Sequence, residues 1–225
     1  MTDGSIQGFG HALARASLAL ARRFSAGATM WCTSPATPWH AHHLAVEFVH
    51  PVIMGKRALP AVAVPPEDPI AALRANVRTG DVIAAVAPAD DPVVAEVMAR
   101  AAAWGATTLW IGFGEPSRTG FADHPLSLDT PSDDAVVRTY HLLWELTHVC
   151  FEHPGLLQVE ECAEEVCITC SDEGRLGEVE VVQEDEAVVR TADGRERIST
   201  AFIDPPALGD LVLVHAGTAI TKVDL

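Results

Sequence analysis

Residues 81–112 read DVIAAVAPADDPVVAEVMARAAAWGATTLWIG, and this stretch decides the fold of the first part of the chain. Residues 81–87 are an apolar run that predicts a strand, and residues 92–104 predict a helix with a proline in its first turn. Residues 107–112 predict a second strand. Strands that are apolar on both sides and separated by a helix indicate a parallel sheet covered on both faces. Ligands of such sheets bind at the carboxyl ends of the strands.

The same alternation extends outward on both sides of this stretch. Residues 28–32, 61–64 and 126–128 are short apolar runs that are typical of strands. Between them, apolar residues recur at helical spacing. The expected helices cover residues 6–24, 38–50, 69–77 and 133–152. We therefore expect an α/β domain over residues 1–155, with a doubly wound, parallel, five-stranded sheet.

In the remainder of the chain, residues 160–225, the hydrophobic pattern has the short period that is typical of β-strands. Residues 178–182 alternate between acidic and apolar side chains, and Asp193-Gly194 is a typical hairpin turn. Five short strands in about sixty residues indicate a small all-β barrel, of the OB-like kind. The expected strands cover residues 178–182, 187–190, 195–202, 211–214 and 219–223.

The charge also changes between these two parts. Residues 1–159 hold 15 acidic and 10 basic residues, a net charge of -5, and residues 160–225 hold 16 acidic and 5 basic residues, a net charge of -11. The break His153-Pro154-Gly155 ends the preceding helix. A step in composition at such a break indicates two domains, residues 1–155 and residues 160–225.

The overall composition excludes several classes of protein. With 31 acidic and 15 basic residues, the chain is a poor binder of nucleic acids and anionic membranes, because contacts with phosphate require clustered Lys and Arg. No uncharged apolar run is long enough for a spanning helix, and no basic segment followed by an apolar one marks a secretory signal. Three of the five cysteines are Cys162, Cys167 and Cys170. We expect a soluble cytoplasmic protein whose thiols stay reduced for metal or transfer chemistry.

The last strands carry a dense motif, GDLVLVHAGTAITKVD at residues 209–224. This segment resembles the end of the HypC/HupF family of hydrogenase maturation chaperones. The resemblance implies a small barrel that carries an iron fragment with cyanide and carbonyl ligands. It also implies two partners, a HypD-like maturation protein and the precursor of the large subunit of a nickel–iron hydrogenase.

The iron-carrying residue of that family is a cysteine at the second position of the chain. Here the corresponding region holds Cys167 and Cys170 in the chain interior, and either could match; the Pro-Gly that follows in the family is missing in both registers. Soft thiolates suit a low-spin ferrous iron, and His215 could orient the thiolate. The alternative is that these cysteines are small buried residues or half of a zinc ribbon, although the sequence has no second Cys pair downstream.

The first part is similar to the sugar isomerase (SIS) domain, and within it to the phosphoheptose isomerases. The segments that carry the resemblance are AHHLAVEFV at 41–49, RALPAVA at 57–63, GDVI at 80–83, GATTLWIG at 105–112 and YHLLWEL at 140–146. SIS domains commonly associate through their helices. The resemblance therefore implies a homodimer or tetramer.

The same resemblance implies a metal site. Its zinc ligands would be His43, Glu47, Asp133 and His141, with Glu47 also serving as a base and His141 as its acid partner. His43 and Glu47 are four residues apart, and Asp133 and His141 are eight apart, so each pair shares a helix face. Asp133 stands where the family has Gln, which adds a negative charge. The alternative is that these histidines are ordinary helix residues paired with carboxylates.

The phosphate-binding turns of that family are altered here. The first turn keeps Thr33, Ser34 and Thr37 as weak candidate donors to a substrate but has no glycine, and the second contains Asp90 and Asp91. Two like charges about 4 Å apart repel by about 4 kcal/mol at an effective dielectric near 20. We therefore expect that phosphosugar binding is lost.

These observations support two principal hypotheses. The first is a hydrogenase maturation factor in which the barrel carries iron and the SIS-like domain serves for dimerisation or docking. The second is a zinc-dependent isomerase of sugar phosphates of the sedoheptulose 7-phosphate type, with Glu47 and His141 as catalytic residues and the barrel as a regulator. A scaffold in which both sites are vestigial is a third possibility.

Overall fold

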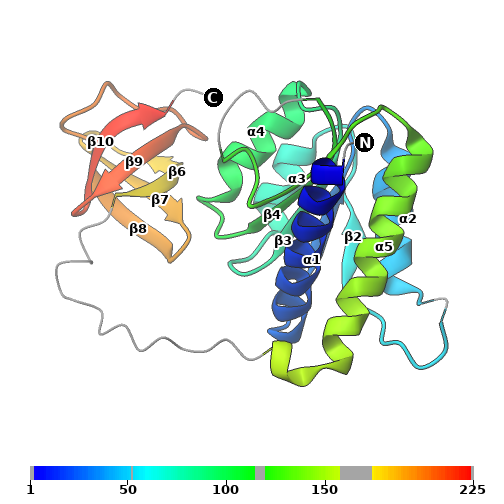
Figure 1. The fold of residues 1–225 in the computed structure, drawn as a ribbon. Coiled ribbons are helices and arrows are strands. Elements are labelled where there is room, and N and C mark those ends of the chain that lie inside the picture. The colour runs from blue at the N-terminus through cyan, green and yellow to red at the C-terminus, as the bar shows by residue number, and fades with distance from the viewer. Residues whose placement is uncertain (1–2, 52, 115–119, 158–173, 224–225) are drawn as a thin grey trace.

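The computed structural model describes residues 3–51, 53–114, 120–157 and 174–223. They form a parallel sheet with helices on both faces and a closed barrel beside it (Figure 1). The fold class expected from the sequence is confirmed. None of the helices in the described part of the chain is long and apolar enough to cross a membrane.

The sheet has the strand order β2-β1-β3-β4-β5, and every pairing in it is parallel. Its central strand β3 is buried throughout, which explains the unbroken apolar run in the sequence. The strands are β1 (Met30–Thr33), β2 (Ala61–Ala63), β3 (Val82–Val86), β4 (Thr107–Phe113) and β5 (His124–Leu128).

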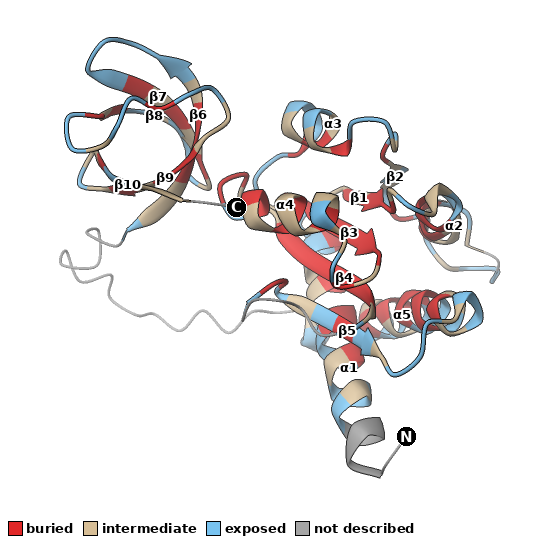
Figure 2. Cartoon of the chain, turned by 90° about the horizontal axis from the view of Figure 1, so that it is seen from above, coloured by how far each residue is buried: buried red, intermediate tan, exposed pale blue. Residues whose placement is uncertain are grey.

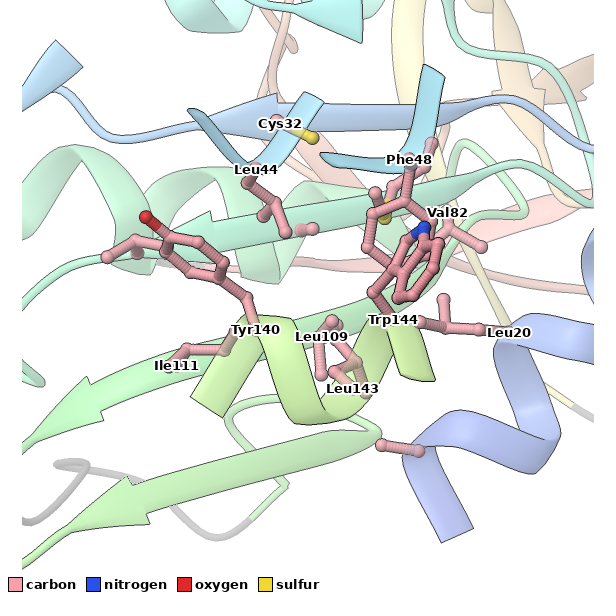
Figure 3. Close-up of a cluster of buried hydrophobic side chains, with 14 of the residues drawn as sticks. Leu20, Cys32, Leu44, Phe48, Val82, Leu109, Ile111, Tyr140, Leu143 and Trp144 are labelled. Atoms are coloured by element: carbon pink, nitrogen blue, oxygen red, sulfur yellow. The ribbon is translucent and has the colours of Figure 1, made fainter. Parts of the chain in front are cut away.

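Three helices cover one face of the sheet and two cover the other (Figure 2). The larger hydrophobic core lies under α1 (Asp3–Ser25), α2 (Pro38–Val49) and α5 (Asp133–Glu152). Figure 3 shows side chains of α2 and α5, among them Leu44, Phe48, Tyr140 and Trp144, packed together in this core. The opposite face is covered by α3 (Pro69–Asn76) and α4 (Pro92–Ala101).

Local sequence explains where α4 begins and ends. The carboxylate of Asp91 accepts a hydrogen bond from the backbone N–H of Val94, and Pro92 occupies the first turn. The helix was expected to reach residue 104 but ends at Ala101. Residues 102–105 instead turn through Gly105, whose φ of 67° is accessible to glycine.

The barrel closes in the order β10-β8-β7-β6-β9. The expected hairpin at Asp193-Gly194 joins β7 to β8, and Thr191 pairs with Gly194 across it. The interior is a separate apolar cluster that includes Val179, Val189 and Val214. The strands are β6 (Arg175–Val182), β7 (Glu186–Thr191), β8 (Gly194–Ser199), β9 (Leu211–His215) and β10 (Thr218–Val223).

A buried carboxylate joins the barrel to the sheet domain. Glu178 of β6 is fully buried and accepts hydrogen bonds from Arg74 of α3, at 2.9 Å, and from Arg100 of α4, at 2.6 Å. Its second oxygen accepts the indole N–H of Trp104 at 2.7 Å. Leu211 of the barrel belongs to the same apolar cluster as Trp104, so the two domains share one hydrophobic core at this contact.

Candidate functional site

Helices α2 and α5 lie side by side and bring three candidate ligands together. His43 and Glu47 lie one turn apart on α2, with His43 Nε2 3.2 Å from Glu47 Oε1. His141 of α5 places its Nε2 3.2 Å from the same Glu47 oxygen and 3.5 Å from His43 Nε2. These three side chains, which we call the His-Glu-His cluster, were all named as ligands from the sequence.

The spacing of these atoms matches a tetrahedral metal site. Ligand atoms about 2.05 Å from a zinc ion in tetrahedral geometry lie about 3.3 Å from one another. The three observed separations are 3.2, 3.2 and 3.5 Å. Two imidazoles and one carboxylate are also a donor set that zinc accepts, and three protein ligands leave a fourth position for water or a substrate. The residues therefore fit zinc.

The His-Glu-His cluster lies at the surface. The side chains of His43 and His141 are 36% and 47% exposed, whereas that of Glu47 is 16% exposed. A substrate could thus reach both imidazoles, while Glu47 is partly shielded from water beneath them. A carboxylate held in this way can accept a proton from a carbon atom, and a neighbouring imidazole can deliver one to an oxygen.

Tyr140 supports the cluster from within the core, and sequence reasoning missed it. Its hydroxyl lies 2.7 Å from Nδ1 of His43 and its ring is fully buried. Burial, with the negative charges of Glu47 and Asp133, raises the pKa of Tyr140, so the phenol stays neutral. A neutral hydroxyl can accept the Nδ1–H bond and so leave the Nε2 lone pair of His43 for a metal. The available signal was that Tyr140 is the single tyrosine of the chain and directly precedes His141.

Asp133, the fourth ligand expected from the sequence, lies outside the cluster. It is the first residue of α5, and its Oδ1 is 3.4 Å from Nε2 of His40. Eight residues of helix span about 12 Å along the axis, so Asp133 and His141 share a face but not a site. Burial lowers the pKa of His40, against the opposing effect of Asp133, and this favours a neutral imidazole.

The residual donors of the first turn are directed into the protein. Thr33 and Ser34 are buried, and the Ser34 hydroxyl donates to the carbonyl of Val86 at 2.7 Å. The hydroxyl of Thr37 lies 2.8 Å from that of Ser34. In the second turn the Asp91 carboxylate caps α4, at the position where an anion would bind a helix N-terminus. This arrangement is consistent with the expected loss of phosphosugar binding.

Cys167 and Cys170, the thiols expected to carry iron, lie outside the described residues, and so does Cys162. His215 ends β9 and is half-buried. The cysteines in the described part of the chain are Cys32 and Cys150, both buried. Burial raises the pKa of each thiol, which keeps it protonated and unsuited to bind a metal.

Comparison with known proteins found a family match for the barrel and a match in fold for the sheet domain. Residues 174–225 match the model of the HupF/HypC family. A search of curated proteins found no match. Among solved structures, the chain is similar to a phosphoheptose isomerase from Francisella tularensis, with 14% identity and a TM-score of 0.52 over 61% of this chain and 85% of that one.

A second similar structure is the phosphoheptose isomerase from Neisseria gonorrhoeae. It has 14% identity and a TM-score of 0.50, and the match covers 64% of this chain and 86% of that one. At such identity the likeness concerns the fold of the sheet domain. The chain is therefore a fusion of a domain with the SIS fold of the phosphoheptose isomerases and a HupF/HypC family domain at residues 174–225.

Proposed function

We propose that this protein is a maturation factor for a nickel–iron hydrogenase and that its barrel carries the iron fragment with its cyanide and carbonyl ligands. The observation that carries the proposal is the match of residues 174–225 to the HupF/HypC family. The iron would be bound by the thiolate of Cys167 or Cys170, because soft sulfur donors suit such a metal.

The register of the barrel supports His215 as the partner of that thiolate. Arg175, the first residue of β6, pairs with Val214 of the antiparallel strand β9. The chain therefore enters the barrel next to His215. Cys170 precedes Gly174 by four residues and Cys167 by seven, so the segment that holds the pair joins the barrel next to the imidazole that would orient the bound group.

The experiment replaces Cys167 and Cys170 with serine, singly and together, in the host that makes the hydrogenase. We expect the double variant to lose hydrogenase maturation and the anaerobically purified protein to lose cyanide and carbonyl infrared bands. Cys162→Ser is the matched control, since it removes a thiol from the same segment without touching the pair. Unchanged hydrogenase activity in the double variant would rule out the carrier role.

The partners of this function would be a HypD-like maturation protein and the hydrogenase large-subunit precursor, all in the cytoplasm. An anaerobic pull-down from the host tests both partners.

We propose that the sheet domain acts as a homodimer or tetramer. Its helices α2 and α5 expose apolar side chains, namely Trp39, Val46, Leu142 and Val149, which supports such an association. Light scattering on the purified protein measures the mass directly.

A second candidate function rests on the geometry of the His-Glu-His cluster. In a zinc-dependent aldose–ketose isomerase, Glu47 would move the proton between adjacent carbons and His141 would protonate or deprotonate the neighbouring oxygen. A bound zinc ion would supply polarisation of the carbonyl group. The Ser34 hydroxyl is taken up by the carbonyl of Val86 and the Asp91 carboxylate caps α4, which counts against a phosphorylated substrate at this end of the sheet.

Incubation of the protein with zinc and a ketose phosphate tests this second function. Formation of an aldose that disappears in Glu47→Gln would support it. Iron with cyanide and carbonyl bands in the purified protein would instead support the carrier, and zinc alone would support the isomerase. A purified protein that contains neither iron nor zinc would indicate a scaffold in which both sites are vestigial.

A further inference from the structure

A groove runs between helix α1 and the edge strand β5, at the end of the sheet where the strands begin. It contains two cavities that share His124, the first residue of β5. The larger, of about 420 Å³, is lined by Arg22, Arg23, Thr107 and His124 among others. The smaller has a volume of about 180 Å³. The His-Glu-His cluster lies elsewhere, on α2 and α5, so this groove is a separate feature.

The groove is strongly basic. Arg22 and Arg23 lie two helical turns after Arg15 on α1, and Arg15 and His11 line the smaller cavity. Residues seven and eight apart on a helix lie on the same face. Three guanidinium groups and two imidazoles therefore converge on one groove in a chain whose formal net charge is -16.

Among the residues that the structure describes, no carboxylate lies within ion-pair distance of Arg15, Arg22 or Arg23. Carboxylate partners are present for six other arginines, whereas Arg57, Arg78 and Arg190 also have none among the described residues. The six are Arg74, Arg100, Arg138, Arg175, Arg195 and Arg197.

The acidic residue of the groove has another partner. Asp123 lines the smaller cavity, and its Oδ2 accepts the backbone N–H and the hydroxyl of Thr108, both at 2.8 Å. These two hydrogen bonds fix the carboxylate at the start of β4, and it forms no ion pair with the arginines of the groove. Burial lowers the pKa of His124, as do the positive charges of Arg15 and Arg23, while Asp123 opposes them. The positive potential of the groove therefore rests on its arginines and not on the His124 ring.

Arg22 is also positioned in advance. Its Nε–H donates to the carbonyl of Leu156 at 3.1 Å, which anchors the guanidinium at the edge of the larger cavity. The terminal N–H groups can then make a forked contact with a planar or tetrahedral oxyanion. The hydroxyl of Thr107 and the ring of His124 add further donors at the first residues of two neighbouring strands.

We propose that this α1–β5 groove binds a small phosphorylated molecule, with its phosphate held by Arg22, Arg23 and His124. Arginine forks recognise phosphate oxygens through charge-assisted hydrogen bonds, and a volume of about 420 Å³ lies in the range of small-molecule sites. The site goes beyond iron delivery and isomerisation, because it lies at the opposite end of the strands from the altered phosphate turns.

Calorimetric titration of the metal-free, full-length protein with inorganic pyrophosphate and with inorganic phosphate at low salt tests the proposal. We expect saturable binding that is tighter for pyrophosphate, and a shift of the His124 ring resonances in NMR spectra. The double variant Arg22→Gln/Arg23→Gln should bind at least about tenfold more weakly, since it removes two charged donors.

Arg138→Gln is the matched control, because Arg138 is an exposed arginine on α5 that pairs with Asp134. It should keep the affinity of the unmodified protein, and all variants should show unchanged thermal unfolding. The proposal is overturned if pyrophosphate does not bind saturably, if the control loses as much affinity as the double variant, or if binding leaves the His124 resonances unmoved.

Discussion

The His-Glu-His cluster and the Glu178 contact are both carboxylates surrounded by nitrogen groups, yet they differ in kind. Glu178 is fully buried. Its partners are two arginines and an indole, which donate hydrogen bonds but do not release their protons. Glu47 is partly exposed, and its partners are two imidazoles, which can offer a lone pair or a proton. The first arrangement can only hold two domains together, whereas the second can exchange a metal or a proton.

Breaking the Glu178 contact should give the largest effect. Glu178→Ala removes the buried carboxylate that Arg74 and Arg100 share and leaves Arg100 with Glu96 alone, and removal of one partner of a buried ion pair costs about 3–5 kcal/mol. We expect a lower free energy of unfolding in urea and separation of the barrel from α3 and α4, visible as increased amide exchange in β6. Glu180→Ala is the control on the same strand, since Glu180 pairs with the exposed Arg195. Equal losses in the two variants would contradict the special role of the buried contact.

Zinc affinity should be the next largest effect. His141→Ala or His43→Ala should weaken zinc binding by about a hundredfold or more, because each would remove one of the three candidate ligands. Competition with a chromogenic chelator measures the affinity. His42→Ala, which removes the neighbouring histidine of α2, is the control and should bind zinc normally. If all three variants bind alike, zinc binds elsewhere.

Tyr140→Phe should have a smaller effect on the same measurement. It removes the hydroxyl that lies 2.7 Å from Nδ1 of His43 while keeping the buried ring. Groups that orient a metal ligand typically contribute about 10- to 100-fold to metal affinity. Unchanged affinity in Tyr140→Phe would show that the hydroxyl does not orient His43.

Acid should weaken the domain contact gradually. Burial by itself would raise the pKa of Glu178, but the hydrogen bonds from Arg74 and Trp104 and the charges of Arg74 and Arg100 outweigh it and lower the pKa below the usual 4.5. A depressed folded-state pKa stabilises the protein above the unfolded-state pKa, and this contribution is lost as the pH falls through the folded value.

Comparison of unfolding at pH 6 and near pH 3 in the unmodified protein and in Glu178→Gln measures this contribution. The difference in stability between the two proteins should shrink at the lower pH, because a protonated glutamic acid and a glutamine both lack the negative charge at this position. A difference that stays constant across this range would show that Glu178 does not titrate with folding.

The sequence by itself determined the alternation of strands and helices, the closed barrel and the pairing of His43 with Glu47. These features depend on periodicity and on spacing within one helix, which neighbouring residues fix locally. The two family motifs likewise identified both domains, because each motif is a short run of residues that can be recognised without knowing how the chain packs.

The tertiary structure decided which of these residues meet. Glu178 and Glu180 alternate with valines and look alike in the sequence, but α4 covers Glu178 and leaves Glu180 partly exposed. Asp133 fits the face of His141 yet lies about two turns away, and Tyr140 contacts His43 only because α2 and α5 pack together. Such contacts depend on distances between separate elements, and packing across the whole fold sets those distances.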